Sequence, residues 1–536
     1  MFYNYNEDYQ YDSCISKGIC SINPRTSSLR EVLVMYLKQL AFYTLQLKYM
    51  GVKNNLTEDI ILNTLSGLMS NLETGNEQFY QTLVNLKMII IESMDIYKKV
   101  CNTRNIKIKE IESEIKLQKR LNITSLIQLG EQEFSRKLKL IPEEKRNLYE
   151  IMFLVIKSIC INLVELKSFG LDDNYSFNEI LYLLNSLNYP KLSVDILNKK
   201  IKHAVKTDFC LVNKIYNLRI ERYGEQTETE VSYSTRPNKA ILVAGTNIQE
   251  LKNVLDATRD KNIDIYTHGE MIVAYTYPLF REYEHLRGQF GKGIENCLLD
   301  FATFPGAILI AKHSLENIEY LYRGRLFTTD NFVPRGVIKV NNKDFSRLIN
   351  SALSAKGFKT GREKDSIKYG CNIENFNHKL DFIINNKQKY KNIVIIGTEV
   401  YNHEQKDYFN KLLKFIPKNT IVISLTNEFI GEKIININMA PDFYTIYRII
   451  NKLKSINIDI TLFLAKCDKH TISNVLNLKE LGVKNVFLSK CTPIMLNPTL
   501  TNTLKTIYHI KPTTNASKDI NILNKWWKIK IHCYTI

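Results

Sequence analysis

The spacing of apolar residues changes at about residue 236, and this change constrains the fold more than any other feature of the chain. Before it, apolar residues recur every three or four positions, as they do from Leu29 to Leu47, which is the period of an amphipathic helix. After it come short, predominantly apolar runs such as residues 240–245 and 392–397, each ending in glycine and followed by a helical pattern. Continuous apolar strands that alternate with helices are typical of parallel sheets covered on both faces.

This pattern predicts a multidomain protein, in which N-terminal α-helical bundles precede two α/β domains with mainly parallel, Rossmann-like sheets. A polar and basic stretch at residues 359–381 separates the two series of apolar runs. We therefore expect an α-helical domain with an N-terminal cysteine region at residues 1–235. We expect the two α/β domains at residues 236–375 and 376–536.

Two helices of the first domain have recognisable ends. Ser176 and Glu179 have the spacing of a capping box, which predicts that a helix begins at Ser176. Pro142 is suited to the first turn of a long helix. Gly170 can end that helix, because glycine readily adopts the left-handed conformation that closes many helices.

Composition excludes some classes of protein. The start of the chain is polar and acidic, unlike a signal peptide, and no apolar stretch is long enough to span a membrane. Ten cysteines scattered over 536 residues suit reduced thiols, so we expect a cytoplasmic protein. The net charge of +18 comes from Lys and Arg that are mixed with Asp and Glu along the chain. This favours a solvated basic surface, and a nucleic-acid-binding module is the lesser alternative.

Polar side chains follow most of the apolar runs. In open α/β sheets, ligands bind at the carboxyl ends of the strands, so these side chains mark the expected site without defining a reaction. They are Thr246, His268, Glu270, Lys312, Ser314, Thr398, Thr426, Asn427, Lys466, Cys467 and Asp468.

Several ordered motifs together resemble one known family. Residues 266–271 read Tyr-Thr-His-Gly-Glu-Met, and residues 14–20 begin and end with cysteine. Further matches occur in the expected order at residues 241–245, 304–309, 325–328, 481–485 and 512–514. The set resembles the hybrid-cluster (prismane) proteins, also called hydroxylamine reductases, over nearly the whole chain. The resemblance implies a helical bundle followed by two sheets. It also implies an activity that reduces hydroxylamine or nitric oxide.

The resemblance also implies two metal centres. One is an N-terminal iron–sulfur cluster held by two pairs of cysteines. Here the second pair is kept as Cys14 and Cys20, and the first pair is replaced by Tyr3 and Asn6. Cys14 and Cys20 could hold a residual or inter-chain iron–sulfur cluster, or they could be two thiols in an ordered turn.

The other centre is a hybrid iron–sulfur–oxygen cluster, whose ligands in the family are one histidine, two glutamates and four cysteines. One glutamate is kept as Glu270. The second falls on Asp468, beside Cys467, and the histidine falls on Thr246. The four cysteines fall on Ser314, Thr398, Asn427 and Ala440.

These replacements remove the soft donors. Thiolate sulfur is the ligand that iron–sulfur clusters require, whereas hydroxyls are hard donors, asparagine is neutral and alanine has none. We therefore expect the hybrid cluster to be absent. Glu270 and Asp468, together with Cys467, could still hold a hard divalent ion.

His268 has two interpretations. It could donate a proton beside Glu270, because its ordinary pKa suits that role. It could instead be a hydrogen-bonded histidine that shapes the end of the strand. Lys312 and Lys466 would supply the charge opposite Glu270, since a buried lone carboxylate is costly.

Three functions remain open. In the first, the protein has lost the hybrid cluster and its reductase activity, and serves as a binding or regulatory protein. Its partner would be a second copy of the chain or an intact relative. In the second, it is a metal-dependent oxidoreductase with a redox partner, acting through a remodelled site of Glu270, Asp468 and Cys467 with His268 or His470. In the third, it is a basic nucleic-acid-binding module.

Overall fold

The computed structural model describes most of the chain in separate stretches. These are residues 24–52, 55–68, 76–111, 117, 122–291, 297–311, 324–333, 336–340, 343–397, 403–426, 429–438, 443–456, 458–465, 470–489 and 498–533. Contacts group the chain into two compact units. The first contains Met1–Ile215, Lys239–Ile263 and Phe304–Gly357, and the second contains Tyr216–Asn238, Asp264–Thr303 and Phe358–Ile536. The three predicted domains remain a prediction.

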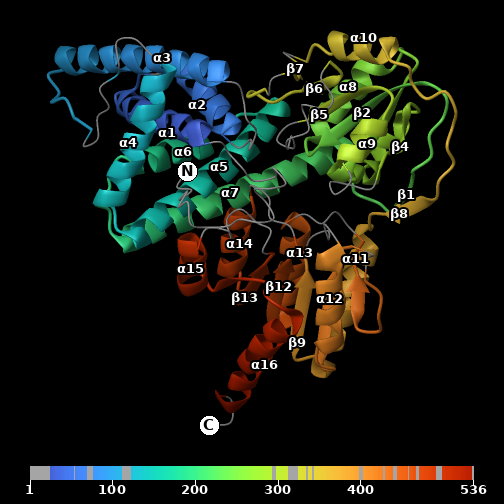
Figure 1. Cartoon of the computed structure of the whole chain (residues 1–536). Helices are drawn as coiled ribbons and strands as arrows, with labels where there is room; N and C mark the ends of the chain where they lie inside the picture. Colours follow the sequence, from blue (N-terminus) through green and yellow to red (C-terminus); the bar gives the residue numbers. More distant parts are fainter. Residues whose placement is uncertain are drawn as a thin grey trace. The chain divides into compact units, whose positions relative to one another are not determined.

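The N-terminal part is helical, as predicted (Figure 1). Its helices are α1 (Pro24–Tyr49), α2 (Asn55–Gly67), α3 (Asn76–Thr103), α4 (Ile123–Leu140), α5 (Glu143–Ser168), α6 (Asn174–Ser186) and α7 (Val194–Tyr223). Helix α1 packs against α3, α4 and α6. It lies close to α4, because a Cβ added at Gly130 would come within 2.1 Å of the Ser28 carbonyl oxygen.

Local chemistry explains where two of these helices begin and end. Helix α5 starts directly after Pro142, and Gly170 follows its end with a φ of 77°, as predicted. The predicted start of α6 at Ser176 is wrong. Asp173 lies just before the helix, and its carboxylate accepts a hydrogen bond from the backbone N–H of Ser176 at 3.0 Å. An ionised carboxylate three residues earlier therefore takes the capping role.

The rest of the chain contains two six-stranded sheets and a short ribbon. The strands of the first sheet are β2 (Lys239–Gly245), β3 (Ile263–His268), β4 (Leu286–Gln289), β5 (Ala307–Ala311), β6 (Leu326–Thr328) and β7 (Ile338–Lys339). Those of the second are β9 (Asn392–Ile396), β10 (Thr420–Ser424), β11 (Ile434–Asn436), β12 (Asp459–Leu464), β13 (Asn485–Leu488) and β14 (Ile510–Pro512). The ribbon pairs β1 (Thr229–Ser232) with β8 (Ser366–Tyr369) in antiparallel fashion.

Both large sheets have the same strand order. The first runs β4-β3-β2-β5-β6-β7 and the second runs β11-β10-β9-β12-β13-β14. Counted along the chain, each is therefore third, second, first, fourth, fifth, sixth, which is the order of doubly wound nucleotide-binding sheets. The strand pairs described within both sheets are parallel. The predicted fold class, helical bundle followed by two Rossmann-like sheets, is confirmed.

Helices lie between many of the strands of both sheets and flank them in sequence (Figure 1). Around the first sheet they are α8 (Ile248–Thr258), α9 (Cys297–Thr303) and α10 (Ser346–Ser354). Around the second they are α11 (Ile373–Asn385), α12 (His403–Phe415), α13 (Phe443–Leu453), α14 (Thr471–Glu480), α15 (Pro498–Ile507) and α16 (Ala516–Cys533).

Each sheet has an apolar cover. Helix α10 packs against β2 and β5. In the second sheet, Val394 and Phe463 pack with Phe409 of α12 and with Ile520 and Leu523 of α16. The residues of β9 and β10 are buried throughout, which is why their sequences read as continuous apolar runs rather than as an alternating pattern.

The helical part also buries charge. Seven acidic or basic side chains on α1, α4 and α5 are less than a tenth exposed, and we call them the buried charge network. They are Arg30, Glu31, Lys38, Glu133, Lys137, Glu150 and Lys157. Burying so many charges costs several kcal/mol per ion unless each finds a partner.

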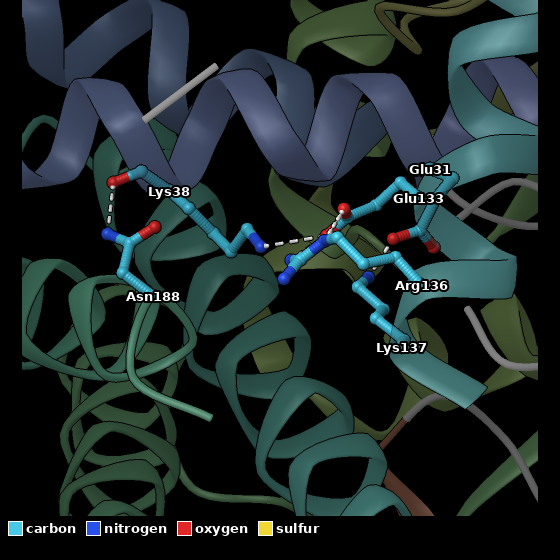
Figure 2. Close-up of polar contacts among 6 residues, drawn as sticks. All are labelled: Glu31, Lys38, Glu133, Arg136, Lys137 and Asn188. Carbon is cyan, nitrogen blue, oxygen red and sulfur yellow. Dashed lines mark hydrogen bonds and ion pairs between the residues drawn. The ribbon is translucent and has the colours of Figure 1, made fainter. Parts of the chain in front are cut away.

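Ion pairs offset part of this cost (Figure 2). The Lys137 ammonium donates a hydrogen bond to the Glu31 carboxylate. Arg136, at the edge of the network, donates two hydrogen bonds to Glu133, at 2.6 and 2.8 Å. Burial nevertheless lowers the pKa of Lys137 to about 7, although the nearby Glu150 acts in the opposite direction.

The lowered pKa of Lys137 predicts a pH-dependent stability. In the unfolded chain a lysine has a pKa of about 10.4, so between about pH 7 and about pH 10 the unfolded state binds more protons than the folded state. The free energy of unfolding should therefore rise with pH in this range, by up to about 1.4 kcal/mol per pH unit from one such group. Urea unfolding between about pH 7 and about pH 9 should show a smaller rise for Lys137→Met than for the wild type.

Lys139 provides the matched control, because it is exposed on the same helix. Lys139→Met should keep the wild-type dependence on pH. If the free energy of unfolding of the wild type rose with pH no more steeply than that of Lys137→Met, a lowered pKa of Lys137 would be contradicted.

Candidate functional site

The strand order locates the candidate site before any side chain is considered. In doubly wound sheets the crevice for ligands lies where the order reverses, at the carboxyl ends of the first and fourth strands. In the first sheet these are the ends of β2 and β5, and in the second they are the ends of β9 and β12. Of the residues predicted from the sequence, Thr246 directly follows β2, whereas those that follow β5, β9 and β12 lie outside the described residues.

The end of β2 is fixed by a close approach of two backbones. Gly245 has a φ of 114°, and a Cβ there would lie 2.3 Å from the carbonyl oxygen of Ala311 at the end of β5. Only glycine fits this position. The next residue, Thr246, is exposed, and its backbone N–H donates a 3.4 Å hydrogen bond to the same Ala311 oxygen. The side chain of Asn247 then caps α8 by accepting from the N–H of Glu250.

His268 ends β3 and is 3% exposed. Its Nε2 lies 3.1 Å from Oδ2 of Asp300, and its ring packs edge-on against Phe301, with the ring centroids 5.0 Å apart. Both partners belong to α9. The Asp300 carboxylate is held close to Gly291, where an added Cβ would come within 2.1 Å of Oδ2.

The turn after His268 is held by the side chain of Gln289. Thr267 donates to Oε1 of Gln289 at 2.5 Å, and Nε2 of Gln289 donates to the Gly269 carbonyl oxygen at 3.0 Å. Burial raises the pKa of Tyr275, so this phenol, 3.4 Å from the Thr267 hydroxyl, is neutral at ordinary pH. These contacts set the direction in which the chain leaves β3.

Glu270 lies in this turn. Gly269 has a φ of 61°, and the 3₁₀ helix η1 (Gly269–Thr276) starts at once. Glu270 is in its first turn and is half-buried. In the described part of the chain, the His268 imidazole contacts Asp300 and Phe301 and not Glu270. The structure therefore brings His268 together with a residue that sequence reasoning did not select.

Most of the other predicted site residues lie outside the described residues. They are Tyr3, Asn6, Cys14, Cys20, Lys312, Ser314, Thr398, Asn427, Ala440, Lys466, Cys467 and Asp468. His470 is described and lies just before α14. Within the described stretches, no three His, Cys, Asp or Glu side chains are placed to hold a metal ion. The predicted metal and catalytic roles stay predictions.

The donors that are described do not match an iron–sulfur centre. At the end of β2 the chain offers the hydroxyl of Thr246, and after β3 it offers the carboxylate of Glu270. Both are hard oxygen donors, whereas such centres are held chiefly by thiolate sulfur. A carboxylate could serve as one ligand of a mixed cluster, but these two groups alone do not hold one.

Comparison with known proteins agrees with this fold. Residues 10–426 match the model of the Prismane/CO dehydrogenase family. The chain belongs to this family. It is 26% identical over 530 residues to a hydroxylamine reductase of Thermodesulfovibrio yellowstonii, covering 95% of this chain and 97% of the relative.

Other relatives of the same name are similar over the same length. The hydroxylamine reductase of Acidiphilium cryptum is 23% identical, with 94% of each chain covered. That of Desulfitobacterium hafniense is 24% identical, with 95% of this chain and 96% of the relative covered. The similarity to these prismane-family proteins thus includes both sheets and the helical part. None of the described helices is long and apolar enough to cross a membrane.

The His268–Asp300 contact predicts a specific loss of stability. Asp300→Ala would leave the buried Nε2 of His268 without this partner, at a cost of about 1–3 kcal/mol in the free energy of unfolding. Asp300→Asn keeps an acceptor and should cost less. Chemical denaturation of the purified variants measures both effects.

Asp256 is a suitable control, because it is about half exposed and pairs with Lys252 one helical turn away. Asp256→Ala should change stability by no more than about 0.5 kcal/mol. If Asp300→Ala were no more destabilising than Asp256→Ala, His268 would not depend on Asp300.

Proposed function

We propose that this protein is a member of the hydroxylamine reductase family that does not assemble the hybrid cluster and serves as a non-catalytic binding or partner subunit. The observation that carries the proposal is the kind of side chain available as an iron ligand at the carboxyl ends of the strands. Thr246 lies at the switch point of the first sheet, where the family resemblance implies a histidine ligand. Thr246 is exposed, whereas Gly245 before it makes a close backbone contact and Asn247 after it caps α8.

The sequence supports the same conclusion at the other positions. Where the resemblance implies cysteines, the chain has Ser314, Thr398, Asn427 and Ala440. One serine could replace one thiolate, but asparagine and alanine cannot donate an anionic ligand at all. Losing the four thiolates together removes the soft sulfur donors that would bind the irons.

The preserved shape supports a binding role. Gly245 keeps a backbone contact that no larger residue would allow, and Gln289 still braces the turn after β3. The natural partner is an intact member of the same family or a second copy of this chain, because either would present a related surface. Scattered cysteines favour a reducing compartment, and we propose the cytoplasm.

One observation favours a second candidate, a metal-dependent reductase with a remodelled site. Glu270 is kept and is held half-buried at the carboxyl end of β3. Together with Asp468, Cys467 and His470 it would bind a hard or borderline divalent ion. His268 is a weaker member of such a site, because its Nε2 is already engaged by Asp300.

The content of iron and acid-labile sulfide decides between the two candidates. Protein purified without oxygen from iron-supplied cells should contain neither in stoichiometric amount, and should not reduce hydroxylamine with a reduced dye. An intact relative expressed and purified in parallel gives the positive control. A hybrid-cluster spectrum would overturn the proposal, and turnover that is lost in Glu270→Ala would establish the second candidate.

The partner role has its own measurement. Co-expression with an intact hydroxylamine reductase of the same cell, followed by sizing chromatography and mass spectrometry of the complex, should yield mixed or self-assembled oligomers. A monomer that stays separate from the relative would refute the partner role and leave the cluster result untouched.

A further inference from the structure

A small cavity lies inside the helical part, next to the buried charge network. Its volume is about 30 Å³, about twice or more the roughly 10–15 Å³ that one water molecule requires. The apolar part of its wall comes from Val34, Ile141, Phe153 and Leu187. The polar part comes from Lys38, Lys137, Tyr149 and Glu150.

Lys38 is the cation of this wall whose charge is least compensated. Its side chain is 5% exposed, and its Nζ forms an ion pair with Oε1 of Glu133 at 3.7 Å, longer than an ordinary hydrogen bond (Figure 2). Both oxygens of Glu133 already accept hydrogen bonds from Arg136. The contact to Asn188 uses the Lys38 backbone oxygen and does nothing for the ammonium.

The other polar groups of the wall have partners of their own. Lys137 donates to Glu31. The Tyr149 hydroxyl donates to the Tyr189 carbonyl oxygen at 2.5 Å. Glu150 acts electrostatically on Lys137 and on Lys157. The excess positive charge therefore lies on the Lys38 side of the cavity.

We propose that this cavity binds one small monovalent anion, of the size of chloride, through the ammonium group of Lys38. A buried ammonium has three donors and strongly favours an acceptor beside it. A halide supplies both an acceptor and the missing negative charge, and it fits a volume of this size. Water would supply an acceptor only, and would leave the charge of Lys38 shared with a carboxylate that Arg136 already neutralises.

Anion binding at this site is coupled to protonation. Burial lowers the pKa of Lys38, an effect that Glu133 opposes and Arg136 reinforces. An anion beside the ammonium favours the protonated form, so halide affinity increases as the pH falls. The charged or titratable groups facing Lys38 are Glu133, Arg136 and Lys137 from α4 and Tyr149 and Glu150 from α5.

The test compares chloride and bromide with gluconate, which is too large for the cavity, at equal ionic strength. The melting temperature of the full chain should rise with added chloride or bromide and not with gluconate. In Lys38→Met this rise should be lost. Lys98→Met removes an exposed lysine on α3, and it should keep the full response.

A second measurement locates the anion. Crystals soaked in bromide should show anomalous scattering within contact distance of Lys38 Nζ. If Lys38→Met fails to fold, Lys38→Gln keeps a polar group without the charge and should also lose the halide response. Equal melting temperatures in chloride and gluconate, or crystals with only water in the cavity, would overturn the proposal.

Discussion

The close approach of β2 and β5 at their carboxyl ends is the constraint on which the site depends. Gly245 lets the backbone of β2 pass within contact distance of Ala311, and this contact sets where both strands stop. The second sheet shows a related arrangement, in which the N–H of Gly397 donates to the Phe463 carbonyl oxygen at 2.9 Å, and a Cβ at Gly397 would meet Ile446 and Leu462. Because the strand order reverses at these points, the general rule for doubly wound sheets places a ligand crevice there whatever residues follow. The fold can therefore keep its site while the ligands change.

The turn after β3 shows how contacts between side chains and backbone hold the shape of this site. Gln289 and Thr267 fix the backbone, and Asp300 fixes the His268 ring, so Glu270 keeps a defined position. None of these contacts needs a metal. This independence makes a prismane-family chain with altered ligands physically reasonable, because fold and chemistry rest on different residues.

The buried charge network places a different demand on the helical part. Apolar residues of similar volume often stabilise a core as well as buried ion pairs do, so stability alone does not explain its seven acidic or basic side chains. Lys137 and Glu31 pair directly, and Arg136 occupies Glu133. Lys38 lies beside a cavity and shares the Glu133 carboxylate, 3.7 Å from its ammonium, with Arg136. An anion bound in the cavity would balance the charge of Lys38.

The sequence by itself determined the helical first part, the two parallel sheets and the polar positions after the strands. Helices and buried parallel strands each impose their own spacing of apolar residues, which can be recognised in the sequence. It also predicted that α5 ends at Gly170, which follows the helix with a positive φ. It failed at Ser176, since the competing cap of Asp173 depends on backbone geometry. Only the tertiary structure decided that His268, at the end of β3, pairs with Asp300, which lies 32 residues further along the chain on α9. It alone also brought Lys38, Glu133 and Glu150 together from three helices, because such contacts depend on how helices pack and have no fixed spacing in sequence.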